Sequence, residues 1–171
     1  MKLDAVVLAA LAFTGVAFAQ GAPNDAQIAH IVVTANQVDI DAGKLAESKG
    51  SNAQVKAFGK QMVTDHTGVN QQAVALAKKL NVTPQDNPTS QSLKTGGAEN
   101  VKKLTGLSGA AFDRAYVDHE IAYHEQVLDA IDKVLVPNAK NEELKALIVK
   151  VRPAFVAHLE HAKMVKGQIK G

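Results

Sequence analysis

Polar, titratable side chains interrupt the apolar stripes of the long helices that this sequence predicts. A stripe position on a bundle helix normally carries Leu, Val, Ile or Ala, because it faces the core. A buried polar group at such a position costs about 1 to 3 kcal/mol unless it finds a partner. Four stripes contain one such residue each, and these are Asp39, His66, His124 and His158. We therefore expect the four side chains to meet in the core.

Two interpretations of this polar centre follow from its chemistry. In the first, the carboxylate and the imidazoles only hydrogen-bond to one another and set the register of the helices. In the second, three imidazoles and one carboxylate bind one divalent transition metal ion, for which zinc and copper are the best matches. Both interpretations stay open on the sequence alone.

Three further residues lie close enough along the helices to contribute to such a site. Met62 and Glu120 each precede a stripe histidine by four residues, which is about one helical turn, and His161 follows a stripe histidine by three. Met62 would add a thioether, which favours copper, although filling core space is the commoner role of a methionine. Glu120 can orient the ring of His124, or form an ordinary pair along the helix. His161 either completes a chelating pair or lies at the surface.

A ferritin-type di-iron centre is disfavoured. Such centres take Glu-x-x-His from each of two helices and one Glu from each of the other two. None of the six histidines has a glutamate three residues before it. Nucleophile triads, phosphate-binding loops and nucleotide fingerprints do not appear either. The sequence therefore predicts no catalytic residue and names no reaction.

Four long helices must position these side chains. In the last, stripe residues recur at alternating steps of four and three, the spacing of a helix packed in a bundle. They are Leu144, Ile148, Val151, Phe155, His158, Ala162, Val165 and Ile169. We expect this helix to start at Asn141, and Pro153 to kink it or open one turn, because proline cannot donate to the preceding turn.

The other helices have recognisable ends. Asn24 and Gln27 match a capping box at the start of the first helix. Gly50 is expected to end that helix in a left-handed conformation, with Ser51 and Gln54 starting the second helix, which runs from about 52 to 80. The third is expected to begin after residue 108 and to close at residues 137–138.

A long connection, about 81–107, separates the second helix from the third. Residues 87–97 are polar and lack periodicity, so we expect a helix only around 98–104. A connection of this length can cross a whole bundle, as in ferritin-like folds. We therefore predict an all-α, ferritin-like up-and-down four-helix bundle with a long crossover, formed as a single domain by residues 20–171.

The first nineteen residues predict an export signal. Lys2 lies in a short n-region, residues 5–18 are mainly apolar, and Ala17-Phe18-Ala19 matches a cleavage site. The absence of cysteine suits an oxidising compartment. We expect a mature chain that starts at Gln20, lies in the periplasm or at the periphery of the envelope, and has no transmembrane span.

Composition and charge narrow the function further. The chain has 171 residues, 46% of them hydrophobic, which is enough for one good core. Nineteen basic and seventeen acidic residues give a formal charge of +2, so charge gives nucleic-acid binding no support. Protein partners are not predicted. The alternative to metal binding is a non-catalytic envelope stress or interaction module, which would expose a large apolar face.

Several segments together resemble a known family. They are Asn36-Gln37-Val38-Asp39-Ile40, the stretch 55–66 that ends Met-Val-Thr-Asp-His, Phe112-Asp113-Arg114-Ala115-Tyr116-Val117 with His124, and Pro153 with His158-Leu159. In these segments the chain resembles the secreted bacterial family called domain of unknown function 4142, often labelled predicted outer membrane proteins and regarded as ferritin-like. The family usually has glutamate at the place of Asp39 and alanine at that of Gly59. The resemblance implies a periplasmic four-helix bundle without an established activity.

Overall fold

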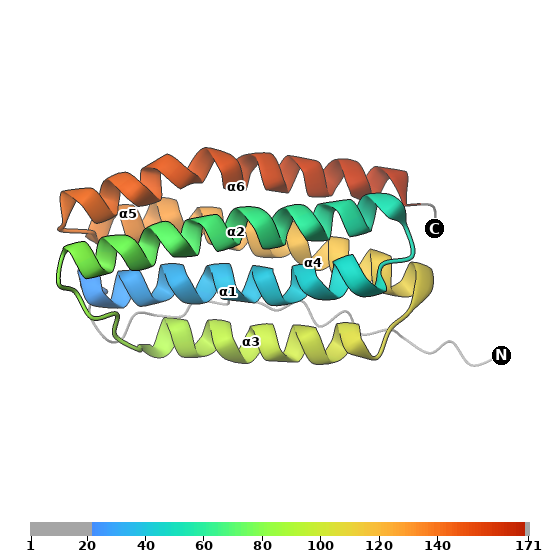
Figure 1. The fold of residues 1–171 in the computed structure, drawn as a ribbon, viewed down its shortest axis with the longest axis horizontal. Helices are drawn as coiled ribbons and strands as arrows, with labels where there is room; N and C mark the ends of the chain where they lie inside the picture. Colours follow the sequence, from blue (N-terminus) through green and yellow to red (C-terminus); the bar gives the residue numbers. More distant parts are fainter. Residues whose placement is uncertain (1–21, 170–171) are drawn as a thin grey trace.

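A computed structural model describes residues 22–169 and shows a chain folded into helices, with no strand in that range (Figure 1). The helices are α1 (Asp25–Lys49), α2 (Ala53–Lys79), α3 (Pro88–Thr105), α4 (Gly109–Ala130), the π-helical segment η1 (Ile131–Leu135), α5 (Val136–Asn138) and α6 (Glu142–Gln168). The all-α prediction is confirmed, and the four long helices predicted from the stripes are α1, α2, α4 with its continuation, and α6. No helix within the described residues combines the length and apolar character needed to cross a membrane.

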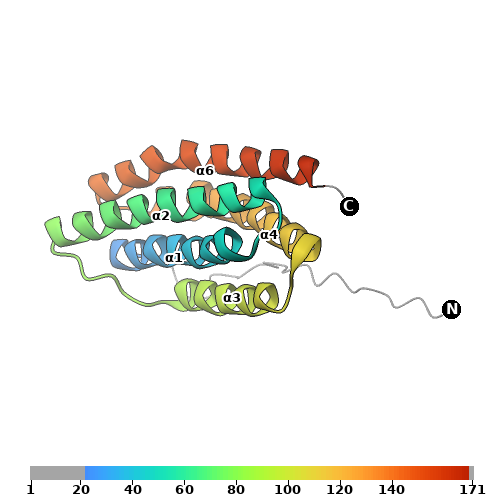
Figure 2. The same cartoon turned by 45° about the vertical axis from the view of Figure 1, so that its right-hand side comes forward.

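The long helices lie side by side, and α3 packs along the outer side of α1 (Figures 1 and 2). Followed by colour in Figure 1, α1 and α6 run in one direction and α2 and α4 in the other. Helix α3 carries the chain back along the bundle, so α4 begins at the end where α1 turns into α2. The long connection therefore crosses the bundle largely as a helix.

The prediction that residues 87–97 are irregular was wrong. Helix α3 begins at Pro88, a residue suited to the first helical position, and Asn87 caps it. The Asn87 side chain accepts from the backbone N–H of Ser90, and the Ser90 hydroxyl accepts from the backbone N–H of Asn87. This helix buries only a narrow, largely polar face, which is why no apolar period marks it. The buried residues are Ser90, Gly97, Asn100 and Leu104.

The turn between α1 and α2 also differs from the expected one. Gly50 has φ −51° and ψ 137°, so it is not left-handed. Asn52, not Ser51, caps α2, and its side chain accepts from the backbone N–H of Gln54. Asp113 then accepts from the backbone N–H groups of Ser51 and Asn52 and from the Ser51 hydroxyl. An aspartate near the start of α4 therefore serves the start of α2.

The turn before α6 is held in the same way at the other end of the bundle. Asn141 caps α6, as predicted, and accepts from the backbone N–H groups of Glu143 and Leu144. The carboxylate of Asp25, in the first turn of α1, accepts from the backbone N–H groups of Lys140 and Asn141. Each of the two hairpins thus supplies an aspartate that fixes the turn of the other.

Two prolines lie in the interior of the long helices, Pro137 near the end of the third and Pro153 inside the last one. Pro137 lies in α5, directly after the π-helical turn of η1, in which the N–H of Val136 donates to the carbonyl of Ile131. A wider turn of this kind suits a helix that a proline would otherwise interrupt. Pro153 lies inside α6, which continues as helix to Gln168 and is arched in Figure 1.

The apolar core consists of two clusters separated along the bundle. One contains Ile28, Val32, Val69, Ile131, Ile148 and Phe155 with their neighbours, and the other contains Ala46, Phe58, Met62, Phe112, Tyr116 and Val165 with theirs. On each of α1, α2, α4 and α6 the predicted polar stripe residue falls between the segments that feed the two clusters. The fold therefore places a polar layer at mid-bundle, between two apolar ones.

Candidate metal centre

Three histidines from three helices converge in the polar layer. His66 of α2, His124 of α4 and His158 of α6 are each at most 2% exposed. One ligand atom of each ring lies within 4.8 Å of the corresponding atoms of the other two. The ring centroids are 5.7 Å apart for His66 and His124, 5.2 Å for His66 and His158, and 5.5 Å for His124 and His158. Counted from the turns, the stripe residues of one hairpin are offset by roughly 6 Å along the helix axes. The reach of the packed side chains spans this offset.

A hydrogen bond fixes the orientation of each ring. His66 Nδ1 lies 2.7 Å from Asn36 Oδ1, His124 Nδ1 lies 3.0 Å from the main-chain oxygen of Glu120, and His158 Nε2 lies 2.9 Å from Asp65 Oδ2. All three partners are acceptors, and the amide of Asn36 is oriented by its own bond to the Val32 carbonyl. The named ring nitrogens must therefore carry the protons.

The other nitrogen of each ring is left with a free lone pair. His66 Nε2, His124 Nε2 and His158 Nδ1 are buried and have no hydrogen-bond partner. A histidine whose first nitrogen donates to an acceptor, so that the second can bind an ion, is the usual arrangement around protein-bound metals. Each ring therefore keeps one unprotonated nitrogen that could bind an ion.

Burial keeps the rings neutral. It lowers the pKa of His66 to about 2 and that of His124 to about 4, and it also lowers the pKa of His158, whose bond to Asp65 acts in the opposite direction. The neighbouring histidines lower the pKa of His66 and His124 further. At neutral pH the free nitrogens are therefore unprotonated, as metal ligands must be.

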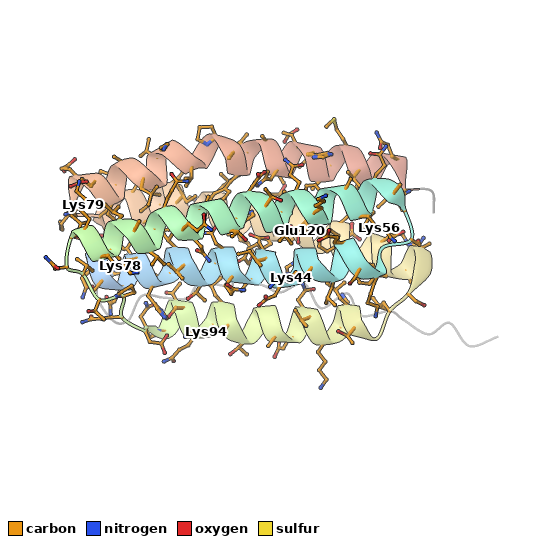
Figure 3. The ribbon with its side chains drawn as sticks, in the orientation of Figure 1. Lys44, Lys56, Lys78, Lys79, Lys94 and Glu120 are labelled. Atoms are coloured by element: carbon orange, nitrogen blue, oxygen red, sulfur yellow. The ribbon has the colours of Figure 1, made fainter. Side chains whose placement is uncertain are left out.

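Two carboxyl groups complete the layer. Asp39 of α1 and Glu120 of α4 are 3% and 0% exposed, and with His124 they form a second group whose ligand atoms lie within 4.8 Å of one another. Asp39 Oδ2 is 3.5 Å from His66 Nε2, and Glu120 Oε2 is 3.6 Å from His124 Nδ1. Asp39 Oδ1 and both carboxyl oxygens of Glu120 have no hydrogen-bond partner. Figure 3 shows Glu120 inside the bundle, whereas the labelled lysines project outward.

The carboxyl pair lacks a compensating positive charge. Burial raises the pKa of both groups, and the Glu120 carboxylate raises the pKa of Asp39 further. Among the described residues no lysine or arginine lies within ion-pair distance of either group, and the basic side chains nearest to them are histidines that burial keeps neutral. A divalent cation would supply the charge that otherwise has to come from protons.

The structure brings the four predicted residues to one level, with one difference. The carboxylate of Asp39 groups with Glu120 and His124, so the centre is two groups that share His124 and not one tetrahedral set. Glu120, expected as an accessory residue that orients the ring of His124 or forms an ordinary pair along the helix, also has its carboxyl group in the layer. Tyr116, Glu120 and His124 are spaced by four, and this spacing was the signal that Glu120 faces inward.

Two of the accessory residues lie outside both groups. Met62 is fully buried in the second apolar cluster. His161 is half-buried; its Nδ1 is 2.9 Å from Gln61 Oε1, and its ring packs edge-on against Phe58 at 5.1 Å. The stripes single out neither Asp65 nor Asn36, although both orient histidines of the centre. Their roles depend on how neighbouring helices are rotated, which spacing along one helix does not reveal.

Taken together, the layer offers three imidazole nitrogens and two carboxylates. Nitrogen-rich sets of this kind suit zinc and copper, and mixed nitrogen and oxygen sets also accept iron and manganese. Two carboxylates would balance the charge of one divalent ion. Either of the two groups could hold such an ion, and Asn36, Asp65 and the Glu120 main chain orient the three rings.

Comparison with known proteins gives a family but no closer relative. Residues 12–165 match the family described as Domain of unknown function (DUF4142). The search of curated proteins and the search of solved structures find no match. The matched span covers most of the chain, including all five side chains of the polar layer. The chain therefore belongs to the DUF4142 family, a domain of unknown function.

Proposed function

We propose that this protein binds one divalent transition metal ion, zinc or copper in the first place, through His66, His124 and His158, with Asp39 and Glu120 as carboxylate ligands. One observation carries the proposal: three buried imidazoles are each held by one nitrogen, while the other nitrogen lacks a partner. The two carboxylates add the negative charge that a cation would neutralise.

The structural alternative accounts less well for these atoms. If the layer served only to fix helix register, its members would satisfy one another, because an unpaired buried polar group costs about 1 to 3 kcal/mol. One nitrogen of each of the three histidine rings is instead unpaired. An interaction module would also expose a large apolar face. The exposed large hydrophobic residues of the described chain are Val74, Val149, Val156 and Met164, on α2 and α6.

The proposal includes a fold type and a compartment. The chain directions of α1, α2, α4 and α6, with α3 returning between the two hairpins, support a ferritin-like bundle. The leader predicted for residues 1–19 lies outside the described residues; together with the lack of cysteine it supports a periplasmic protein. We therefore propose an exported helical bundle that binds a metal ion, and we assign it no reaction.

Elemental analysis tests the metal. Protein purified from the periplasm without a histidine tag or chelator should carry about one zinc, copper or related ion per chain. His124→Ala and His158→Ala should lose stoichiometric metal, because each removes one nitrogen ligand. His161→Ala and His30→Ala are the matched controls and should keep it. Metal-free wild type that gains no thermal stability from added zinc, copper, manganese or iron would contradict the proposal.

A further inference from the structure

A cavity of about 270 Å³ runs from the surface of the bundle to the polar layer. Its mouth includes Pro88 and Ser92 from the start of α3 and Asp129 near the end of α4, all of them exposed. Its inner end includes Asp39 and His66, which are buried. The cavity therefore extends from the surface of the bundle to Asp39 and His66 of the polar layer.

The walls between mouth and inner end are mainly apolar. They are formed by residues such as Ile31, Val127, Ile131, Leu147, Ile148 and Phe155. Among the described residues that line the cavity none is a lysine or an arginine. Walls of this kind favour an apolar ligand, and the lack of a basic side chain disfavours an anionic one.

Some polar atoms of the lining residues already have hydrogen-bond partners, and others do not. The Tyr123 hydroxyl donates to the Ala35 carbonyl, and both polar atoms of the Asn36 amide are engaged. Asp39 Oδ1 and His66 Nε2, at the inner end, have no partner. A hydroxyl group can donate to one of these two acceptor atoms, whereas a carboxylate would bring a third acidic group beside Asp39 and Glu120.

The volume limits the size of the ligand. A dry apolar cavity of about 150 Å³ accommodates benzene, so a cavity nearly twice as large accommodates about ten or eleven non-hydrogen atoms. Two fused rings or a medium-length alkyl chain have this size.

From these features we propose that the cavity binds a small uncharged apolar molecule of about ten non-hydrogen atoms, with one hydroxyl group directed at Asp39 and His66. The inference deepens the proposed function, because the hydroxyl would lie beside the metal centre. Occupancy of the cavity does not itself require the metal, so the two claims can fail separately.

The first experiment measures binding of 2-naphthol to the metal-free protein. The chain has no tryptophan, so naphthol fluorescence can be excited without background from that residue. We expect saturable binding of one naphthol per chain. Naphthalene, which lacks the hydroxyl, should bind about tenfold more weakly, as expected for one lost hydrogen bond, and 2-naphthoate should be weaker than 2-naphthol. No saturable naphthol binding, or equal binding of all three compounds, would overturn the inference.

A second experiment places the ligand in the cavity. Ala130 of α4 lines it, whereas Ala122 of the same helix is exposed and does not. Ala130→Leu should weaken naphthol binding at least about tenfold by filling the space, and Ala122→Leu should leave it unchanged. Ala35→Leu, which fills the cavity from α1, replaces Ala130→Leu if that variant does not fold. Wild-type affinity in a folded cavity-filling variant would show that naphthol binds elsewhere.

A third experiment separates this inference from the metal proposal. In cobalt-loaded protein, 2-naphthol should change the visible absorption of the ion, since its oxygen lies beside Asp39 and His66. An unchanged spectrum with naphthol bound would contradict the orientation. If the protein binds no cobalt and no other divalent metal, the metal proposal fails, while the naphthol-to-naphthalene ratio and the Ala130→Leu variant still decide whether the cavity binds as proposed.

Discussion

His158 of α6 and Asp65 of α2 are joined by a hydrogen bond of 2.9 Å between Nε2 and Oδ2. The side chain of His158 is 3% exposed and that of Asp65 is 41% exposed, so a carboxylate at the surface orients a buried ring. The bond holds the proton on Nε2 and leaves the buried Nδ1 without a partner. It also ties the last helix to the second at the level of the polar layer.

Asp65→Ala should therefore weaken metal binding without removing a ligand. We expect a loss of about 10- to 100-fold in affinity, the usual effect of removing the partner of a metal-bound histidine. Competition with a chromogenic chelator measures it. Asp41→Ala, which removes another exposed carboxylate of the hairpin, should bind metal as the wild type does. Equal affinities for the two variants would show that Asp65 does not act on the centre.

The metal-free protein should be most stable near pH 6.5. The pKa values of His66 and His124 in the folded chain, about 2 and about 4, lie below the unfolded value of 6.5. As pH falls below 6.5, the unfolded chain takes up protons that the folded chain cannot, and stability is lost. Burial also lowers the pKa of His119 and His158, so histidines outweigh the two carboxyl groups in this range.

Above pH 6.5 the carboxyl pair determines how the free energy of unfolding changes with pH. Asp39 and Glu120 have raised pKa values, so the folded chain keeps protons that the unfolded chain has released, and their contribution is lost as pH rises toward the folded values. Each pH unit over which one such proton is kept costs about 1.4 kcal/mol. Urea unfolding curves, measured by circular dichroism at a series of pH values between 5 and 9, should show a maximum in the free energy of unfolding. A stability that rises steadily from pH 7 to 9 would contradict the raised pKa values.

Metal binding should release protons from the carboxyl pair. At pH 7 the rings are already neutral, so a site of histidines alone would release almost none, whereas ligation by Asp39 and Glu120 should displace about one or two protons. Titration calorimetry in two buffers of different ionisation enthalpy gives the number. Glu120→Gln should reduce the release. Metal binding with no proton release would exclude the carboxylates as ligands.

Adjacent glycines of α3 should respond oppositely to alanine. A Cβ on Gly96 would meet nothing within 4 Å, so Gly96→Ala should stabilise the protein by up to about 1 kcal/mol through helix propensity. A Cβ on Gly97 would lie 2.7 Å from a methyl group of Val38, a stiff, buried side chain of α1. Gly97→Ala should therefore destabilise the protein relative to Gly96→Ala, in thermal unfolding. Equal effects would mean that α3 does not pack on α1 at this point.

The stripes predicted the long helices well, because an apolar residue at every third or fourth position has to face a core. They also predicted that Asp39, His66, His124 and His158 face the core, where each of them is buried. The first half of helix α3 was not predicted, because the buried face of this helix consists mainly of Ser90, Gly97 and Asn100 and contains few apolar residues.

Other features depend on contacts between helices. Asp65 follows from the sequence only as a polar neighbour of His66, and its bond to a residue 93 positions away requires the packed bundle. Gly50 and Ser51 match a common cap pattern, but the carboxylate of Asp113 provides a different partner for the turn. Local spacing predicts which residues face inward, while their partners depend on the rotation of neighbouring helices.

The reciprocal contacts of Asp25 and Asp113 have a consequence for how the protein unfolds. Each hairpin turn obtains acceptors for its backbone N–H groups from the opposite hairpin, so neither half retains a fully capped turn when the halves separate. The two halves should then unfold in one cooperative transition, with no populated half-bundle. An ion held between them would be released all at once, and its loss would report global unfolding instead of local fraying.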